Sequence, residues 1–206
     1  MKQKLHKTIF LALSCLIACI DSNEPEPLRA PGLRAPAIPG IVMTDALGNV
    51  YGRYGNPDEP GPLMGNGPDT LQHGTTPRVF DVSAAYPMPS NRSFNVQYDI
   101  SWPSIVSIWI VRGTYTGNNS SLSFGNATLS TPGGIAVKTI TRDELKNPGR
   151  YTFQWDGTSS DNGQYVPLGF YRVYVSSDQF LLWRDVFIFD TCKDIPIDMD
   201  TRGFCN

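Results

Sequence analysis

Few side chains in this sequence have the types and spacing that acid–base or nucleophilic catalysis requires. His73 would be the one histidine left in the chain if residues 1–18 are removed during export, and it lies in a Gly/Pro-rich stretch beside no obvious nucleophile. The sequence contains no Gly-x-Ser-x-Gly elbow, phosphate loop, Cys-x-x-Cys pair or His-Glu-x-x-His helix. Paired carboxylates could hydrolyse sugars, but no particular two of the 19 acidic residues are indicated. We therefore predict that the protein is not an enzyme and that it holds no cofactor.

Two groups of acidic residues raise the question of a calcium site. Asp194, Asp198 and Asp200 lie close together near the C-terminus, and Asp156 lies five residues before Asp161. Hard cations take such oxygen ligands, but neither spacing matches the twelve-residue calcium loop with its final glutamate. We interpret both groups as turn-forming or solvated acids, and we predict no metal site.

Aromatic side chains could form a platform for a sugar ring. Trp109 and Trp183 stand among apolar neighbours in expected strands, which favours the core. Trp102 precedes Pro103 at an expected turn, so we select Trp102 as the possible ligand contact.

The N-terminus has the pattern of an export signal. Three lysines precede an apolar run at Ile9–Ala18 of roughly ten residues, about half of what a membrane-spanning helix needs. The segment Leu16-Ile17-Ala18-Cys19 resembles the bacterial lipobox, which implies a signal peptide over 1–18 and lipidation of Cys19. Ile20 stands where aspartate would resemble an inner-membrane retention signal, so we expect a lipid anchor in the outer membrane.

Net charge disfavours one class of partner, and the remaining cysteines predict a disulfide. Removing three signal lysines from 17 basic residues leaves 14 against 19 acidic ones, a net charge near −5, which disfavours nucleic acid as a partner. Cys192 and Cys205 would then remain, and in an oxidising compartment two leftover cysteines most simply form a disulfide. We expect this disulfide in a C-terminal tail, 190–206.

The remaining chain divides by composition. Residues 20–78 hold ten prolines and nine glycines, so we interpret 19–40 as a disordered, lipidated tether and 41–78 as a Gly/Pro-rich segment. Within the latter, Ile41–Thr44 and Val50–Tyr54 predict a small hairpin. From 79 to 189 alternating apolar residues and regular turn signals predict an all-β sandwich. Its expected strands are Val79–Ala85, Ser93–Ser101, Ile105–Arg112, Ser121–Phe124, Ile135–Ile140, Gly149–Trp155, Phe170–Val175 and Leu181–Phe189, with a helical turn at Arg142–Leu145.

Several short motifs within 79–189 have clear physical roles. Asp156-Gly157 and Asn162-Gly163 supply the positive backbone angles of tight turns, and Trp155 is a large anchor whose indole N–H needs a partner when buried. Pro87 and Pro89 are expected to end a strand.

The same motifs resemble a known group of modules. The segment Tyr86-Pro87-Met88-Pro89 is similar to the opening of the C-terminal sorting domain of type IX secretion in Bacteroidota, and the later half is similar to the immunoglobulin-like domain of the flagellar hook-capping protein. The matching residues are Tyr86, Pro87, Pro89, Trp155, Asp156, Gly157, Asp161, Gly163, Gly169 and Tyr171. The resemblance implies a single immunoglobulin- or fibronectin-III-like sandwich in which these residues are structural.

Together these features predict a non-enzymatic envelope lipoprotein that displays the sandwich for adhesion, assembly or protein–protein interaction. Its expected partners are the membrane, through the lipid anchor, and envelope or surface proteins. The alternatives are a carbohydrate-binding accessory lipoprotein, a type IX sorting module, and an exported hydrolase of unfamiliar type.

Overall fold

The computed structural model describes residues 35–57, 63–64, 80–117, 134–178, 180–199 and 205. These residues belong to one compact unit, Gly32–Asn206. They form strands and one short 3-10 helix, which confirms the all-β prediction. Within the described part of the chain, no helix is long and apolar enough to span a membrane.

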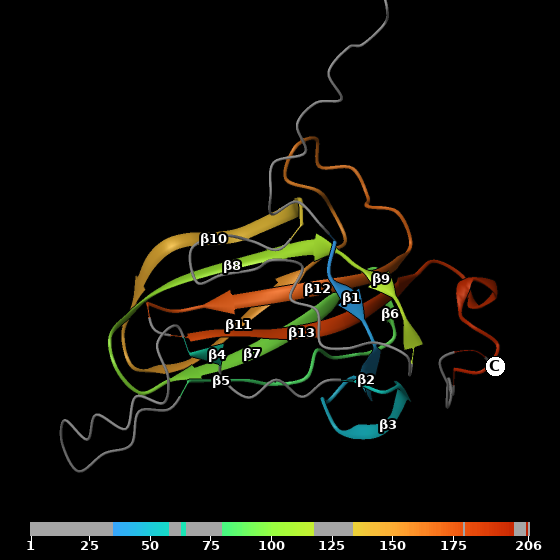
Figure 1. Cartoon of the computed structure of the whole chain (residues 1–206), viewed down its shortest axis with the longest axis horizontal. Helices are drawn as coiled ribbons and strands as arrows, with labels where there is room; N and C mark the ends of the chain where they lie inside the picture. The colour runs from blue at the N-terminus through green and yellow to red at the C-terminus, as the bar shows by residue number, and fades with distance from the viewer. Residues whose placement is uncertain are drawn as a thin grey trace, which may run out of the picture. The chain divides into compact units, whose positions relative to one another are not determined.

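The larger sheet has the order β10-β8-β12-β13-β4, and β6 also pairs with β13 (Figure 1). All its neighbouring strands are antiparallel except the parallel pair of β6 and β13. Its strands are β10 (Ala136–Lys146), β8 (Ser104–Arg112), β12 (Gly169–Ser176), β13 (Phe180–Phe189), β4 (Leu63–Met64) and β6 (Ser90–Asn91). Strand β8 is central, as its unbroken run of apolar residues predicts, because β10 and β12 flank it.

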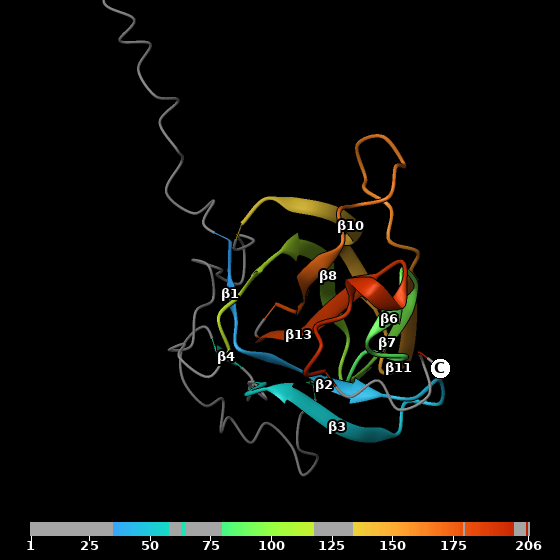
Figure 2. The ribbon, with the colours of Figure 1, turned by 90° about the vertical axis from the view of Figure 1, so that its right-hand side faces the viewer.

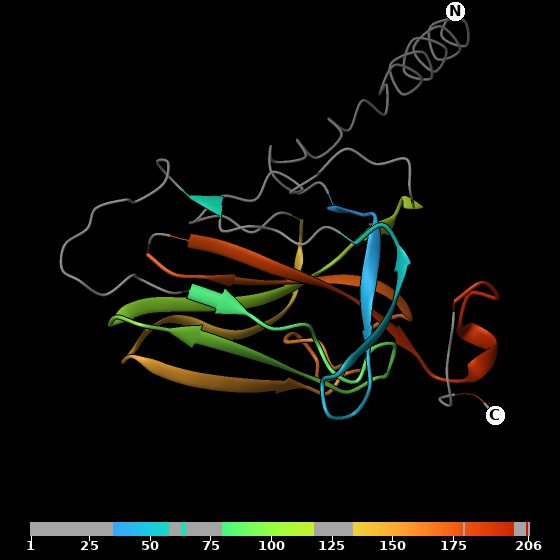
Figure 3. The ribbon, with the colours of Figure 1, turned by 90° about the horizontal axis from the view of Figure 1, so that it is seen from below.

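The smaller sheet has the order β11-β7-β5, with β11 (Gly149–Trp155), β7 (Phe94–Ile100) and β5 (Phe80–Val82). Strand β7 alternates perfectly, since Phe94, Val96, Tyr98 and Ile100 are buried and the residues between them are not. These side chains share one core cluster with inward residues of β8 and β12. The two sheets therefore face each other across a common core, and Figure 3 shows them as two layers.

Two N-terminal pieces also belong to this unit. Strand β1 (Ala37–Ile38) pairs in parallel with β9 (Thr114–Tyr115), and β2 (Gly40–Thr44) forms the predicted hairpin with β3 (Val50–Gly55). Ile38 and Ile41 are fully buried, and Ile41 joins the main core cluster. Residues 35–40 of the predicted tether are thus part of the folded domain, and Figure 2 shows β2 and β3 below the sheets. The earlier part of the tether lies outside the described residues.

One local prediction is wrong. Arg142–Leu145 is not a helical turn but lies inside β10, which continues to Lys146. The strand takes up extra residues at register shifts on both sides of Thr141, and Asp143 has a φ of 50°. The polar run that imitates a helix start is therefore a bulged strand. The expected strand Ser121–Phe124 lies outside the described residues.

Candidate functional site

One candidate site is a groove of about 660 Å³ on the outer face of the larger sheet, a volume typical of small-molecule sites. Strands β8 and β12 contribute Ser107, Trp109 and Ser176 to it. Strand β10 adds Thr139, Thr141, Arg142 and Asp143, and the turn after β12 adds Asp178.

The bulge in β10 shapes one side of this groove. The Asp143 backbone N–H donates to Ser107 Oγ over 2.8 Å, and Ser107 Oγ donates to a carboxylate oxygen of Asp143 over 3.0 Å. These reciprocal bonds hold Asp143 in its left-handed conformation beside the groove. On the other side, Ser104 Oγ donates to Asp178 and holds that carboxylate in place.

The groove offers a mixture of polar groups and one aromatic side chain. Arg142 is exposed and makes no hydrogen bond or ion pair within the described structure. Trp109 is 7% exposed and stacks on Tyr174, with ring centroids 5.2 Å apart. Its indole N–H is buried and meets no acceptor among the described residues. The site can thus donate and accept hydrogen bonds around a neutral polar ligand.

A buried ion pair lies farther along the same outer face. Arg172 of β12 stands opposite Asp185 of β13, and its Nε and Nη2 donate to the two carboxylate oxygens over 2.6 and 2.7 Å. The side chains are only 1% and 4% exposed. Burial alone lowers the pKa of Arg172, but the charge and hydrogen bonds of Asp185 outweigh it, so the pKa lies above its ordinary value. Arg172 Nη2 also donates to the Ala37 carbonyl over 3.0 Å, which attaches β1 to the sheet.

The Trp155 and Tyr171 motif forms the centre of the core. The Trp155 ring makes edge contacts with Phe94 and Tyr171, each at 5.5 Å between centroids, and its indole N–H donates to the Thr158 carbonyl over 2.8 Å. Tyr171 lies near the start of β12, and its hydroxyl donates to the carbonyl of Pro167, four residues upstream. This hydrogen bond connects the start of β12 to the turn that precedes it.

The remaining motif residues of this half form turns. Asp156 accepts hydrogen bonds from the Thr158 backbone N–H and hydroxyl, and these bonds lower the pKa of the carboxyl. Gly157 has a φ of 75°, and a Cβ there would lie 2.8 Å from the Arg92 carbonyl oxygen, so the position needs glycine on two counts. Gly163 and Gly169 also have positive φ, and Asp161 is exposed in the turn between them and β11.

The Tyr86–Pro89 segment pairs on both sides, although its prolines were expected to end strand pairing. Tyr86 exchanges backbone hydrogen bonds with Asn95 of β7, and Met88 exchanges them with Thr44 of β2. The peptide bonds before Pro87 and Pro89 are cis. Because proline has no N–H, the residues before them, Tyr86 and Met88, supply the N–H groups for these hydrogen bonds. Met88 is fully buried, and its sulfur accepts from the Phe187 backbone N–H at 3.1 Å. The segment therefore joins β7 to the N-terminal hairpin.

Trp102 lies at a different place from the groove. It is half-buried and packs edge-on against Phe80 and Phe180, with centroids 6.4 and 5.5 Å away. These contacts give it a packing role at one end of the core. Sequence reasoning missed Trp109 as a groove residue, because an apolar strand environment indicates core and gives no sign of which face is hollowed.

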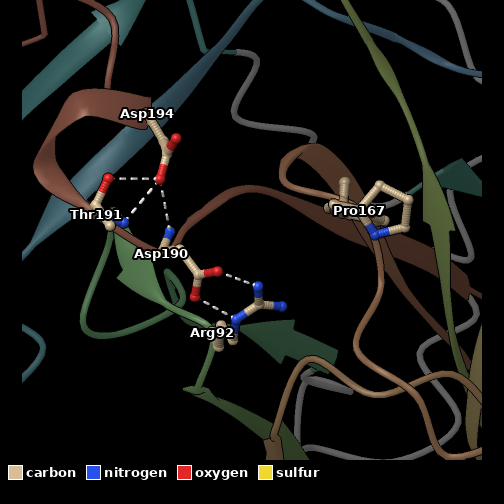
Figure 4. A network of polar contacts seen from close by, with 6 residues as sticks. Arg92, Pro167, Asp190, Thr191 and Asp194 are labelled. Carbon is tan, nitrogen blue, oxygen red and sulfur yellow. Dashed lines mark hydrogen bonds and ion pairs between the residues drawn. The ribbon is translucent and has the colours of Figure 1, made fainter.

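The C-terminal tail carries the expected disulfide between Cys192 and Cys205. Figure 4 shows how its start is held: Arg92 forms a two-pronged ion pair with Asp190, and Asp194 accepts from the Asp190 and Thr191 backbone N–H groups. The hydrogen bonds from Arg92 lower the pKa of Asp190, and those from Thr191 lower the pKa of Asp194.

Asp194 and Asp198, the two described members of the C-terminal acidic group, have separate partners. Asp194 caps the 3-10 helix η2 (Cys192–Asp194), whereas Asp198 accepts a hydrogen bond from the Tyr54 hydroxyl at 3.2 Å. No cluster of three or more His, Cys, Asp or Glu side chains that could hold a metal occurs within the described ranges. The predicted positions Cys19, His73 and Asp200 lie outside those ranges.

No known family, curated protein or solved structure matches this chain.

Proposed function

We propose that this chain is a non-enzymatic lipoprotein of the bacterial outer membrane, anchored through Cys19, that displays an immunoglobulin-like sandwich for adhesion, assembly or protein–protein interaction. Two observations support the proposal. The strand order is compatible with an immunoglobulin-like sandwich, with β5, β7 and β11 as strands A, B and E and β8, β10, β12 and β13 as strands C, C′, F and G. The hydrogen bond from the Tyr171 hydroxyl to the Pro167 carbonyl is the contact that a tyrosine corner would make in such a sandwich. Sandwiches of this kind recur in cell-surface recognition, but that link is an analogy of fold. The turn role of Asp156 agrees with a structural function for the motif acids.

Cell fractionation tests the anchor and the display together. Wild-type protein should sediment with outer membranes, and protease added to intact cells should show whether the sandwich faces outward. A Cys19→Ala chain should lose the outer-membrane association, because the acceptor of the lipid is gone. Equal outer-membrane association of the two chains would refute the lipid anchor.

The groove supports a second candidate, a carbohydrate-binding accessory lipoprotein. Sugar recognition uses hydroxyl, carboxylate and guanidinium groups around an aromatic side chain, and Ser107, Asp178, Arg142 and Trp109 bring all four to one groove. In this candidate function the glycan would bind in the groove and not at Trp102, which the sequence had suggested as the ligand contact.

A glycan array separates the two candidates. Binding to a defined glycan that falls at least tenfold in Arg142→Ala would support the carbohydrate function, because Arg142 has no structural contact to lose. Arg53→Ala is the matched control, since Arg53 is an exposed arginine on the N-terminal hairpin. Loss of binding in both variants, or in neither, would argue against the groove.

A further inference from the structure

Strand β11 forms an edge of the smaller sheet and pairs with β7 on one side only. Its register with β7 is continuous over all seven residues from Gly149 to Trp155, without a bulge. In an antiparallel pair every second residue directs its N–H and C=O away from the partner strand. No described residue bonds to the backbone on the outer side of β11, so this edge can accept another strand.

Two other sheet edges, at β10 and β5, are covered by described residues. Strand β10 is bulged, and Ser160 covers its edge by donating its N–H to the Val137 carbonyl and accepting the Thr139 N–H, both over 2.9 Å. On the opposite side of the sandwich, Arg184 of β13 donates to the backbone carbonyls of Val82 and Ser83, at the end of β5. Natural sheets commonly protect their edges in such ways, but no described residue makes a comparable contact to the outer edge of β11.

The sequence of β11 is also self-complementary. The segment Arg150-Tyr151-Thr152-Phe153-Gln154 reads polar, aromatic, threonine, aromatic, polar in both directions. Thr152 and Gln154 are exposed, while Tyr151 and Phe153 are only half-buried at the margin of the core. If a second copy of β11 paired antiparallel to the first with the two Thr152 residues opposite each other, each aromatic residue would face an aromatic residue and each polar residue a polar one.

We propose that two copies of this chain associate through β11, antiparallel and with Thr152 opposite the Thr152 of the partner subunit. Tyr151 then faces the partner's Phe153, and Phe153 faces the partner's Tyr151. Arg150 faces the partner's Gln154. The two three-stranded sheets become one continuous six-stranded sheet, and a two-fold axis passes through the Thr152 pair.

Cross-strand chemistry favours this register. Aromatic pairs and threonine pairs directly opposite each other stabilise antiparallel strands. Gln154 donates its amide to Ser93 Oγ at 2.9 Å, which leaves its carbonyl oxygen to accept from the partner's Arg150. The two Arg150 residues would stand four positions apart, about 14 Å, which exceeds the screening length at physiological salt. Each is already paired with its own Asp99, at 2.8 and 3.0 Å.

One neighbouring cation does not oppose the pairing. Lys146 lies over the Tyr151 ring, 5.3 Å from its centre, but its ammonium group is paired with Glu144. An edge pair alone buries little surface, so the association would be weak in dilute solution. Confinement to a membrane would raise the local concentration of the chain and favour the dimer. This concentration effect is the one part of the inference that rests on the proposed lipid anchor.

A cysteine cross-link in the full chain tests the register. Residues that face each other across antiparallel strands have Cα atoms about 4.5 to 5.5 Å apart, within disulfide reach. Thr152→Cys in cells should therefore give a disulfide-linked dimer on non-reducing gels. Asp161→Cys is the control, because Asp161 is also exposed but lies in the turn beyond β11, and this chain should remain monomeric. Dimer yield from Thr152→Cys no higher than from the control would overturn the proposal.

Charge changes at Gln154 provide a second, independent measurement. Gln154→Glu places an anion opposite the partner's Arg150 twice per dimer, and Gln154→Lys places a cation there. The dimer association constant, measured by sedimentation of the full chain in detergent, should change about 2- to 30-fold, upward for Glu and downward for Lys. Equal constants for both variants would refute the register even if a dimer forms. If the Thr152→Cys chain forms the dimer in cells but is absent from their membrane fraction, the anchor is refuted and this inference stands.

Discussion

The buried pair of Arg172 and Asp185 allows a quantitative test of the larger sheet. Replacing Arg172 by methionine keeps most of the side-chain volume but leaves the Asp185 carboxylate, 4% exposed, without its two charged hydrogen bonds. Breaking a buried pair from one side typically costs about 3–5 kcal/mol, because the remaining charge stays desolvated. We expect a loss of this size in the free energy of unfolding, together with a weaker attachment of β1 at Ala37.

The double variant separates the ion pair from simple packing. Replacing Asp185 by leucine in the Arg172→Met chain removes the stranded charge, so the double variant should be clearly more stable than Arg172→Met alone. Replacement of a buried pair by apolar residues is often neutral or stabilising.

Urea unfolding at pH 7, followed by tryptophan fluorescence, measures the free energy of unfolding of the wild type and of each variant. In Arg172→Met the folded state should raise the pKa of the Asp185 carboxyl, so its stability deficit should narrow as the pH falls through that raised pKa. A deficit below about 1 kcal/mol, or a double variant less stable than Arg172→Met, would refute the reasoning.

Three further changes probe other parts of the fold. Trp155→Ala should cost about 3–5 kcal/mol of stability in urea unfolding, because its 1%-exposed ring is at the centre of the core; a cost under 1 kcal/mol would contradict that position. Cys205→Ser should lower stability by about 3 kcal/mol, since Cys192 and Cys205 close a short loop of separation 13, and equal melting temperatures would contradict this. Asp190→Asn should loosen the C-terminal tail in amide exchange at pH 7. The ion pair with Arg92 lowers the folded pKa of Asp190, so its contribution is present above the ordinary aspartate pKa and is lost as the pH falls through the folded pKa; an undiminished difference from wild type at pH 2 would refute it.

Strand positions were predictable where alternation is strong. Strand β7 alternates without interruption, and the apolar run Ile108–Val111 of β8 correctly indicates a stretch that is buried on both faces. The turns after Trp155 follow from the intrinsic preferences of glycine, aspartate and asparagine.

Long-range pairing was not predictable in the same way. Strand β1 has two residues, and its parallel partner β9 lies 77 positions later, so no local period marks it. Arg142–Leu145 imitates a helix start, but its pairing with β8 and the bond from Ser107 to Asp143 impose a bulged strand. Tertiary contacts here override local preference.

The candidate groove depends on the same long-range contacts. It joins Ser107, Arg142 and Asp178, which no sequence motif connects. The buried Arg172 and Asp185 did leave a signal, because each is a charge within a strongly apolar strand. A buried charge of this kind needs a partner, and a neighbouring strand could have been inferred as its source.

The most direct measurement of the central claim is metabolic labelling with palmitate. The account predicts that the wild-type chain carries labelled acyl groups, that the Cys19→Ala chain carries none, and that only the wild type stays with the outer membrane. Equal labelling of both chains, or an unlabelled wild type, would contradict the claim that a lipid on Cys19 holds this β-sandwich at the membrane.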